Sequence, residues 1–179
     1  MTDYSNIQIE TRNLVLRNFV IDDITQDYID WLNDHQTNKY LSLNSKQTFE
    51  SCESYVKSFV GRHDTFLLGI FNKENLLHIG NLTVSMIDLP NQSAWVGISI
   101  GRKEFLGKGL AKEALTSFIN YSFQEIGLHS INAGVTTKNI RSLNLFIKCG
   151  FKIRGLLTES GFTDGEYEDG YILSVIESE

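Results

Sequence analysis

The feature that most constrains the fold is a change of hydrophobic period across a glycine-containing turn near the middle of the chain. Residues 93–100 carry β-branched and aromatic side chains that favour a strand. After Gly107 and Gly109, apolar residues recur every three or four positions over residues 110–123, which predicts a helix with one buried face. A strand followed by a helix and another strand must cross over the sheet, so we expect a parallel strand pair.

The rest of the chain predicts further strands and helices, and their order defines a fold class. Strands are expected at residues 7–17, 66–71, 76–86, 93–100, 128–135, 151–157 and 171–176, and helices at 22–33, 48–60, 110–123 and 139–149. Asp22 or Asp23 is placed to cap the first helix, and Asp164-Gly165 suits the turn between the last two strands. We therefore expect one α+β domain over residues 1–179, with a mixed, mostly antiparallel central sheet of about seven strands flanked by about four helices.

Composition narrows the range of partners. The 179 residues include 22 acidic and 16 basic side chains, giving a net charge of −6, whereas proteins that bind the phosphate backbone of nucleic acids need a basic surface. No apolar run approaches the roughly 20 residues that span a bilayer, and the first residues lack the pattern of a secretion signal. Cys52 and Cys149 have no C-x-x-C spacing, and the four histidines lack metal-ligand spacing. We expect a cytoplasmic protein with no metal, no nucleic-acid partner and no membrane segment.

The turn before residue 110 has the chemistry of a phosphate cradle. The first N–H groups of a helix have no acceptor within the helix and lie at the positive end of its dipole. Gly107 and Gly109 would let a pyrophosphate approach these groups, although a lone G-x-G also occurs in plain strand-to-helix turns. The spacing differs from the dinucleotide fingerprint G-x-G-x-x-G and from the P-loop, which argues against nicotinamide and ATP sites of those kinds.

The segment Leu106-Gly107-Lys108-Gly109-Leu110-Ala111, followed by a strand and by Asn139-Ile140-Arg141-Ser142, resembles the GNAT superfamily of acetyl-CoA-dependent N-acetyltransferases. The family motif is (Gln/Arg)-x-x-Gly-x-(Gly/Ala), and the chain departs from it only at Leu106. A bulky residue at that place is familiar in the RimJ/RimL-like branch, and residues 11–17, 30–34 and 164–169 are similar to the same branch. The resemblance covers nearly the whole chain.

The resemblance implies roles for individual residues. The acetyl-CoA-binding residues would be Ile98, Ser99, Ile100, Leu106, Gly107, Lys108, Gly109, Leu110, Ala111, Asn139 and Phe146. The backbone of the first three would bind the pantetheine arm, and the backbone of residues 106–111 would hold the pyrophosphate. Asn139 would contact the coenzyme near its sulfur, although Asn is also a preferred N-cap. Ser142 would donate a proton to the leaving thiolate, because Phe146, at a position where other members carry Tyr, has no proton to donate.

No general base is assigned from the sequence. Relatives often carry Glu near the end of the strand at residues 93–100, where this chain has Trp95. Acidic side chains around the last turn would either attract a cationic amine or lie in a solvated turn, and they are Glu159, Asp164, Glu166, Glu168 and Asp169. The missing base favours an N-terminal α-amino group as acceptor. With a pKa near 8, about one such group in ten is neutral at pH 7, against roughly one in two thousand for a Lys or polyamine amine.

The expected reaction is direct transfer of acetyl from acetyl-CoA to a primary amine in a ternary complex. No covalent enzyme intermediate is expected, so Cys149 is interpreted as a core residue. The leading acceptor is a protein or peptide N-terminal α-amino group, as the RimJ/RimL-like resemblance suggests. The alternatives are a small-molecule amine (a polyamine or an amino sugar) and a catalytically silent acetyl-CoA-binding module. A homodimer is left open.

Overall fold

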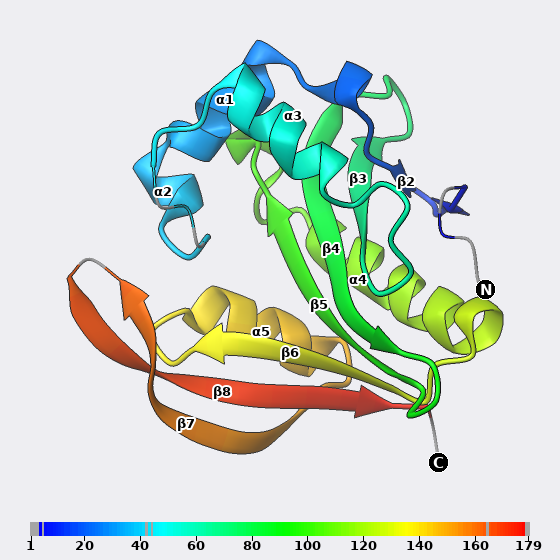
Figure 1. Ribbon diagram of the computed structural model, residues 1–179, viewed down its shortest axis with the longest axis vertical. Coiled ribbons are helices and arrows are strands. Elements are labelled where there is room, and N and C mark those ends of the chain that lie inside the picture. The colour runs from blue at the N-terminus through cyan, green and yellow to red at the C-terminus, as the bar shows by residue number, and fades with distance from the viewer. Residues whose placement is uncertain (1–3, 5, 42, 44, 164, 178–179) are drawn as a thin grey trace.

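The computed structural model describes residues 4, 6–41, 43, 45–163 and 165–177. Its centre is an eight-stranded sheet in the order β1-β2-β3-β4-β5-β6-β8-β7 (Figure 1). The strands are β1 (Gln8–Glu10), β2 (Leu14–Asn18), β3 (Phe66–Asn72), β4 (His78–Asp88), β5 (Ser93–Ile100), β6 (Ser130–Thr136), β7 (Lys152–Thr163) and β8 (Glu166–Ile176). The α-helices are α1 (Gln26–Asn33), α2 (His35–Asn38), α3 (Phe49–Lys57), α4 (Leu110–Tyr121) and α5 (Ile140–Lys148).

The pairing of the strands confirms the expected fold class. β3, β4 and β5 form the predicted antiparallel meander. β5 and β6 are parallel, as the crossover through α4 requires, and the other neighbouring strands are antiparallel. Of the predicted last turn, Gly165 has a φ of 83°, and Asp164 lies outside the described residues.

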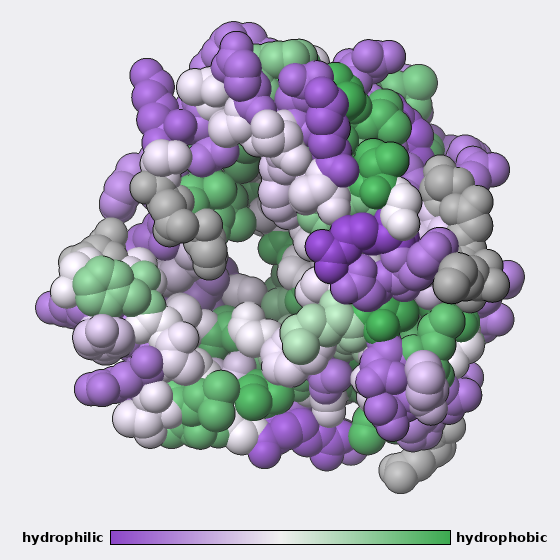
Figure 2. Space-filling view, viewed as in Figure 1, coloured by the Kyte–Doolittle hydropathy of each residue, from purple (hydrophilic) through white to green (hydrophobic). Residues whose placement is uncertain are grey.

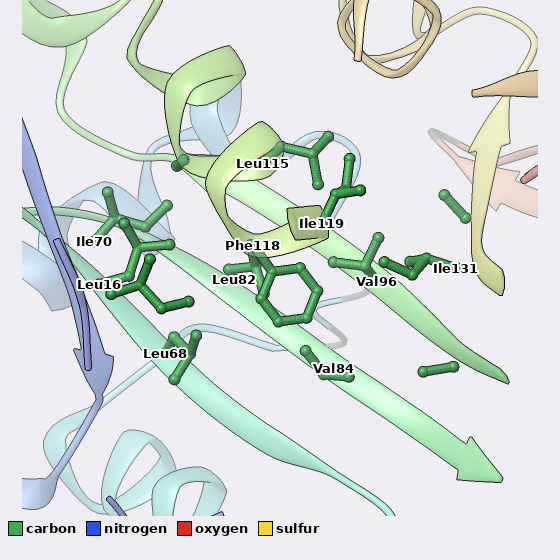
Figure 3. Packing of buried hydrophobic residues seen from close by; sticks show 14 of the residues in the cluster. Leu16, Leu68, Ile70, Leu82, Val84, Val96, Leu115, Phe118, Ile119 and Ile131 are labelled. Atoms are coloured by element: carbon green, nitrogen blue, oxygen red, sulfur yellow. The ribbon is translucent and has the colours of Figure 1, made fainter. Parts of the chain in front are cut away.

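Helices cover both faces of the sheet. In Figure 3, Leu115, Phe118 and Ile119 of α4 point toward Leu82 and Val96 of the sheet. Phe118 is fully buried, and burial of a side chain of that size stabilises the fold by about 1.5–3 kcal/mol. α5 lies on the same face, beside β6. The expected amphipathic helix at residues 110–123 is thereby confirmed over Leu110–Tyr121.

The opposite face is covered by α1 and α3 (Figure 1). A second apolar cluster joins these helices to β3 and consists of Phe19, Ile24, Tyr28, Ile29, Trp31, Cys52, Val56, Leu67 and Phe71. His78 lies among its aromatic rings, with ring centroids 4.5 Å from Phe19 and 5.4 Å from Trp31. Among the described residues, no helix is long and apolar enough to cross a bilayer.

The single strand expected at residues 7–17 is in fact the hairpin of β1 and β2, which accounts for eight strands in place of about seven. Glu113 of α4 holds its turn. The carboxylate of Glu113 accepts hydrogen bonds from the Thr11 hydroxyl at 2.5 Å and from the Asn13 N–H at 2.7 Å. The interruption at these polar residues is therefore a chain reversal fixed by a residue one hundred positions away.

The first helix begins later than the sequence indicates. Residues Ile21–Asp23 form a 3₁₀ turn, and α1 is capped by Thr25, whose hydroxyl accepts the Tyr28 N–H at 3.2 Å. Asp23, one of the two expected caps, instead pairs with Arg17 at 2.6 Å. The same carboxylate accepts the Val20 N–H at 3.0 Å at the start of the 3₁₀ turn. Asp23 therefore serves that turn, and the prediction that Asp22 or Asp23 caps the helix was wrong.

Candidate active site

The facing edges of β5 and β6 separate to leave an opening in the sheet. The two strands pair only at Ser93–Trp95 with Ser130–Asn132, and then diverge, as Figure 1 shows. β5 stays paired with β4 as far as Ile100, while β6 stays paired with β8 as far as Thr136. Figure 2 shows the surface hollowed between these strands. An extended ligand can therefore lie between the strands and hydrogen-bond to backbone.

The open edge of β5 presents the backbone of Ile98 and Ile100. The N–H of Gly101 donates to the Ile79 carbonyl of β4 at 2.9 Å. Backbone groups of successive residues point to opposite edges of a strand, so Ser99 also faces β4, while Ile98 and Ile100 face the opening. The side chains of Ile98 and Ile100 pack against the main core. A ligand-binding backbone and a core-forming side chain are thus compatible at both positions.

The glycine turn follows the open edge and ends at the mouth of α4. Gly107 and Gly109 have φ angles of 74° and 79°, which non-glycine residues adopt with strain. A Cβ built on either glycine would meet no atom within 4 Å. Gly109 is the N-cap of α4 and supplies no side-chain hydrogen bond to the first turn. Bare backbone donors and open space around both glycines fit the pyrophosphate of a coenzyme.

The side chains within this turn point to a cradle made of backbone. The Lys108 ammonium lies 5.3 Å from the centroid of the Phe105 ring, an arrangement that the ring quadrupole favours. Leu110 is buried in the core, and Leu106, at the position where the motif has Gln or Arg, is exposed. At the Leu106 position the turn therefore offers no polar side chain to a phosphate.

Asn139 and Ser142 lie at the start of α5, on the side of the opening formed by β6. The Asn139 side-chain oxygen accepts the Ser142 N–H at 3.1 Å, so Asn139 is the N-cap of this helix. Capping uses the oxygen and leaves the amide N–H groups of Asn139 available as donors. The capping role and the coenzyme contact expected from the resemblance can therefore coexist.

Phe146 and Cys149 are packed residues. Phe146, expected among the coenzyme-binding residues, is 3% exposed, with its ring centroid 4.9 Å from that of Phe151, so the core covers most of its surface. Burial raises the pKa of the Cys149 thiol. The Thr116 hydroxyl donates to this sulfur at 3.7 Å. A raised pKa disfavours the thiolate that a nucleophilic cysteine requires.

The acidic segment contains both exposed and buried carboxylates. Apart from Asp164, its members lie in β7 and β8, where Glu159 and Glu166 are exposed and Glu168 is only 5% exposed. The Lys138 ammonium lies 3.1 Å from Glu168 Oε1 and 3.2 Å from Glu166 Oε2. Hydrogen bonds raise the pKa of Lys138, and the one to Glu168 contributes more than the one to Glu166.

Two buried oxygens on neighbouring strands have no hydrogen-bond partner among the described residues. They are Oε2 of Glu168 and the hydroxyl oxygen of Thr136, on β8 and β6 respectively. Sequence reasoning did not single out Thr136 and gave Glu168 no preference over the other acids. The pairing of Thr136 with Gly170 places them close together, and no spacing rule in the sequence reveals that pairing. The described residues contain no group of three or more His, Cys, Asp or Glu side chains arranged to hold a metal ion.

Comparisons with known proteins identify the family. Residues 13–152 match the sequence profile described as "Acetyltransferase (GNAT) domain". The uncharacterized N-acetyltransferase p20 of Bacillus licheniformis is 29% identical over 174 residues, which cover 94% of this chain and 96% of that protein. The ribosomal protein uS5-alanine N-acetyltransferase of Escherichia coli is 30% identical over 115 residues, or 64% of this chain and 59% of that protein.

The fold is shared with solved structures. The crystal structure of spermidine N-acetyltransferase from Vibrio cholerae in complex with CoA and spermine matches with a TM-score of 0.83 at 23% identity, covering 93% of this chain and 96% of that chain. The eight-stranded sheet, the opening and the backbone cradle are thus set in a fold of known type. With the profile match over most of its length, the chain belongs to the GNAT family and is an acetyl-CoA-dependent N-acetyltransferase.

Proposed function

We propose that the protein transfers acetyl from acetyl-CoA to the N-terminal α-amino group of a protein or peptide, as in the RimJ/RimL-like branch. The observation that carries this proposal is the opening between β5 and β6, which leads from the backbone cradle at Gly107 and Gly109 to the start of α5. The acceptor is supported by the similarity to the uS5-alanine N-acetyltransferase of Escherichia coli.

In the proposed reaction the neutral amine attacks the thioester carbonyl carbon, so that the C–N bond forms and the C–S bond breaks. Ser142 gives a proton to the departing thiolate and takes one back from water, and the amide N–H groups of Asn139 bind near the sulfur. The proton of the amine leaves to water, since Trp95 stands where relatives carry Glu. An α-amino group needs little help in losing this proton, because its pKa is near 8.

A polyamine is the second candidate acceptor. The observation in its favour is the structural match to the spermidine N-acetyltransferase of Vibrio cholerae, together with the acidic residues on β7 and β8. A polyamine amine with a pKa near 10.4 would require about 4–5 kcal/mol of pKa adjustment for attack at pH 7. Because of this requirement, a polyamine is a less favoured acceptor than an α-amino group.

Acetylation of two acceptors tests the proposal. Release of the CoA thiol would be followed with a peptide that begins with alanine, with the same peptide already acetylated at its N-terminus, and with spermidine. We expect turnover with the free peptide, at a kcat/KM above that for spermidine, and none with the blocked peptide. A higher kcat/KM for spermidine would replace the first acceptor with the second.

The cellular setting and the assembly state are also proposals. Acetyl-CoA is a cytoplasmic metabolite, and Cys52 and Cys149 are free thiols, which together favour the cytoplasm. The edge strand β7 exposes apolar side chains, including Ile153 and Leu156, and pairing of such an edge with a second copy would shield them. Sedimentation equilibrium would show whether the chain is a homodimer.

A further inference from the structure

Glu168 is the exceptional acid of this molecule. It is 5% exposed, and its Oε2 has no partner among the described residues. A buried carboxylate oxygen without a hydrogen bond is costly, because it has lost its hydration without gaining a partner. Such a group calls for an explanation outside the packing of the fold.

The register of the strands places Glu168 on the face of the sheet opposite α4 and α5. In antiparallel pairs, directly opposed residues share a face, and the side-chain period is two. Thr136 is opposite Gly170, so Glu168 lies on the face of Thr136 and of Gly134. A Cβ on Gly134 would lie 3.9 Å from the Trp95 ring. Glu168 therefore shares the face of Trp95, away from the helix that holds the pyrophosphate.

An acceptor must approach from this same face. The cradle lies at the start of α4, so the coenzyme reaches the opening from the side of that helix, and the amine must meet the thioester from the other side. Glu168 stands beside the opening there, since its partner Lys138 directly precedes Asn139, the N-cap of α5.

The group that Glu168 holds in the structure is itself a primary ammonium. The Lys138 ammonium lies 3.1 Å from Glu168 Oε1, and its side chain is 53% exposed. Lys138 also contacts Glu166, which is 75% exposed, at 3.2 Å. If Lys138 moves to Glu166 alone, it stays paired and uncovers a buried carboxylate shaped for an R–NH₃⁺ group, with the unpartnered Thr136 hydroxyl beside it.

We propose that Glu168, with Thr136, is the amine-binding site for the acceptor, and that Lys138 occupies it when no acceptor is bound. The inference rests on the proposed function and deepens it by naming the residue that recognises the reacting amine. The acceptor ammonium displaces the Lys138 ammonium from the Glu168 carboxylate, and Lys138 remains paired with Glu166. The bound ammonium then loses a proton to water, and the neutral amine attacks the thioester. The site takes primary amines and excludes amides and N-acetylated amines, which carry no positive charge.

Three substitutions with opposite expected effects test this site. Glu168→Gln keeps the shape and removes the charge, so we expect kcat/KM for the alanine peptide to fall about tenfold or more through KM, with the Kd for acetyl-CoA unchanged. Lys138→Met removes the competing ammonium and should lower the KM for the amine. Glu159→Gln, an exposed acid of the same hairpin, is the matched control and should stay within about twofold. Thermal melting of each variant checks folding.

The outcomes of these experiments distinguish failure of the amine-binding site from failure of the proposed function. Equal losses in Glu168→Gln and Glu159→Gln, or a raised KM in Lys138→Met, would overturn the site and leave the proposed acetylation standing. If the wild-type protein acetylates neither peptide nor spermidine, the proposed function fails separately. The CoA-loaded protein is then titrated calorimetrically with the free and blocked peptides. Binding of the free peptide that is lost in Glu168→Gln supports the site, and equal binding or none in both proteins overturns it.

Discussion

The six-membered ring of Trp31 lies directly on the backbone of Gly101, so closely that a methyl group on Gly101 would coincide with the ring. Trp31 belongs to α1, and Gly101 directly follows β5, the strand that faces the opening. This contact fixes the position of the helix against the end of that strand.

We expect Gly101→Ala to displace Trp31 and to lower the free energy of unfolding by about 1–3 kcal/mol, as overpacking of a core does. Urea unfolding would measure the loss. In a Trp31→Ala background the same substitution should cost much less, because the colliding ring is absent. Equal costs in both backgrounds would show that the collision is not the cause.

The backbone cradle at Gly107 and Gly109 leads to a prediction about the affinity for CoA. Gly109→Trp should raise the Kd for CoA more than tenfold, because a side chain at the N-cap of α4 would fill the space beside the backbone donors. Gly127→Trp is the matched control, since Gly127 has a φ of 77° and equally open surroundings. Calorimetric titration of both variants with CoA would separate a blocked site from general backbone strain.

Ser142→Ala tests the proton donor. If Ser142 protonates the thiolate, we expect kcat to fall about a hundredfold, while the affinity for CoA and the melting temperature change little, since the α5 cap uses the Ser142 backbone and not its hydroxyl. Phe146→Leu should affect stability more than turnover, because the Phe146 ring packs on Phe151. An unchanged kcat in Ser142→Ala would remove Ser142 from the mechanism.

His78 predicts a pH dependence of stability. Burial, the largest cause, lowers the pKa of His78 to about 4, and an unfolded histidine has a pKa near 6.5. Between these values the unfolded state binds a proton that the folded state does not. The free energy of unfolding is therefore highest above about pH 6.5 and falls as the pH decreases toward 4. The loss amounts to about 1.4 kcal/mol per pH unit.

Denaturant unfolding at several pH values would measure this slope, with His78→Phe as the comparison. The Phe variant keeps an aromatic ring among Phe19 and Trp31 and has no proton to bind. The stability difference between the two proteins should therefore change across this pH range. A constant difference would mean that His78 is already protonated in the fold.

Much of the fold could be predicted from the sequence because its signals are local. The change of hydrophobic period at Gly107 predicted β5, the glycine turn and α4, and the polar turn sequences predicted the antiparallel meander of β3, β4 and β5. The β1–β2 hairpin was missed because its turn depends on Glu113, a partner far away in the chain. The start of α1 was misplaced because Asp23 is taken by Arg17. Both errors come from contacts that no window of neighbouring residues contains.

The features of the site likewise separate into those that local sequence predicts and those that depend on contacts between distant parts of the chain. Backbone donors around Gly109 follow from residue type and local conformation, and the capping role of Asn139 follows from its place before a helix. The distance over which β5 and β6 pair depends on how two separate parts of the chain pack. The burial of Glu168 likewise depends on the pairing of β8 with β6, so an acid in a hairpin could not be distinguished beforehand from its exposed neighbours.

β5 and β6 pair over a short junction, only Ser93–Trp95 against Ser130–Asn132. This short junction affects how the enzyme can evolve. Backbone strain introduced in β8 or α5 has few hydrogen bonds through which to reach the cradle. Substitutions in β7 and β8 can therefore accumulate while the backbone cradle at Gly107 and Gly109 is inherited intact.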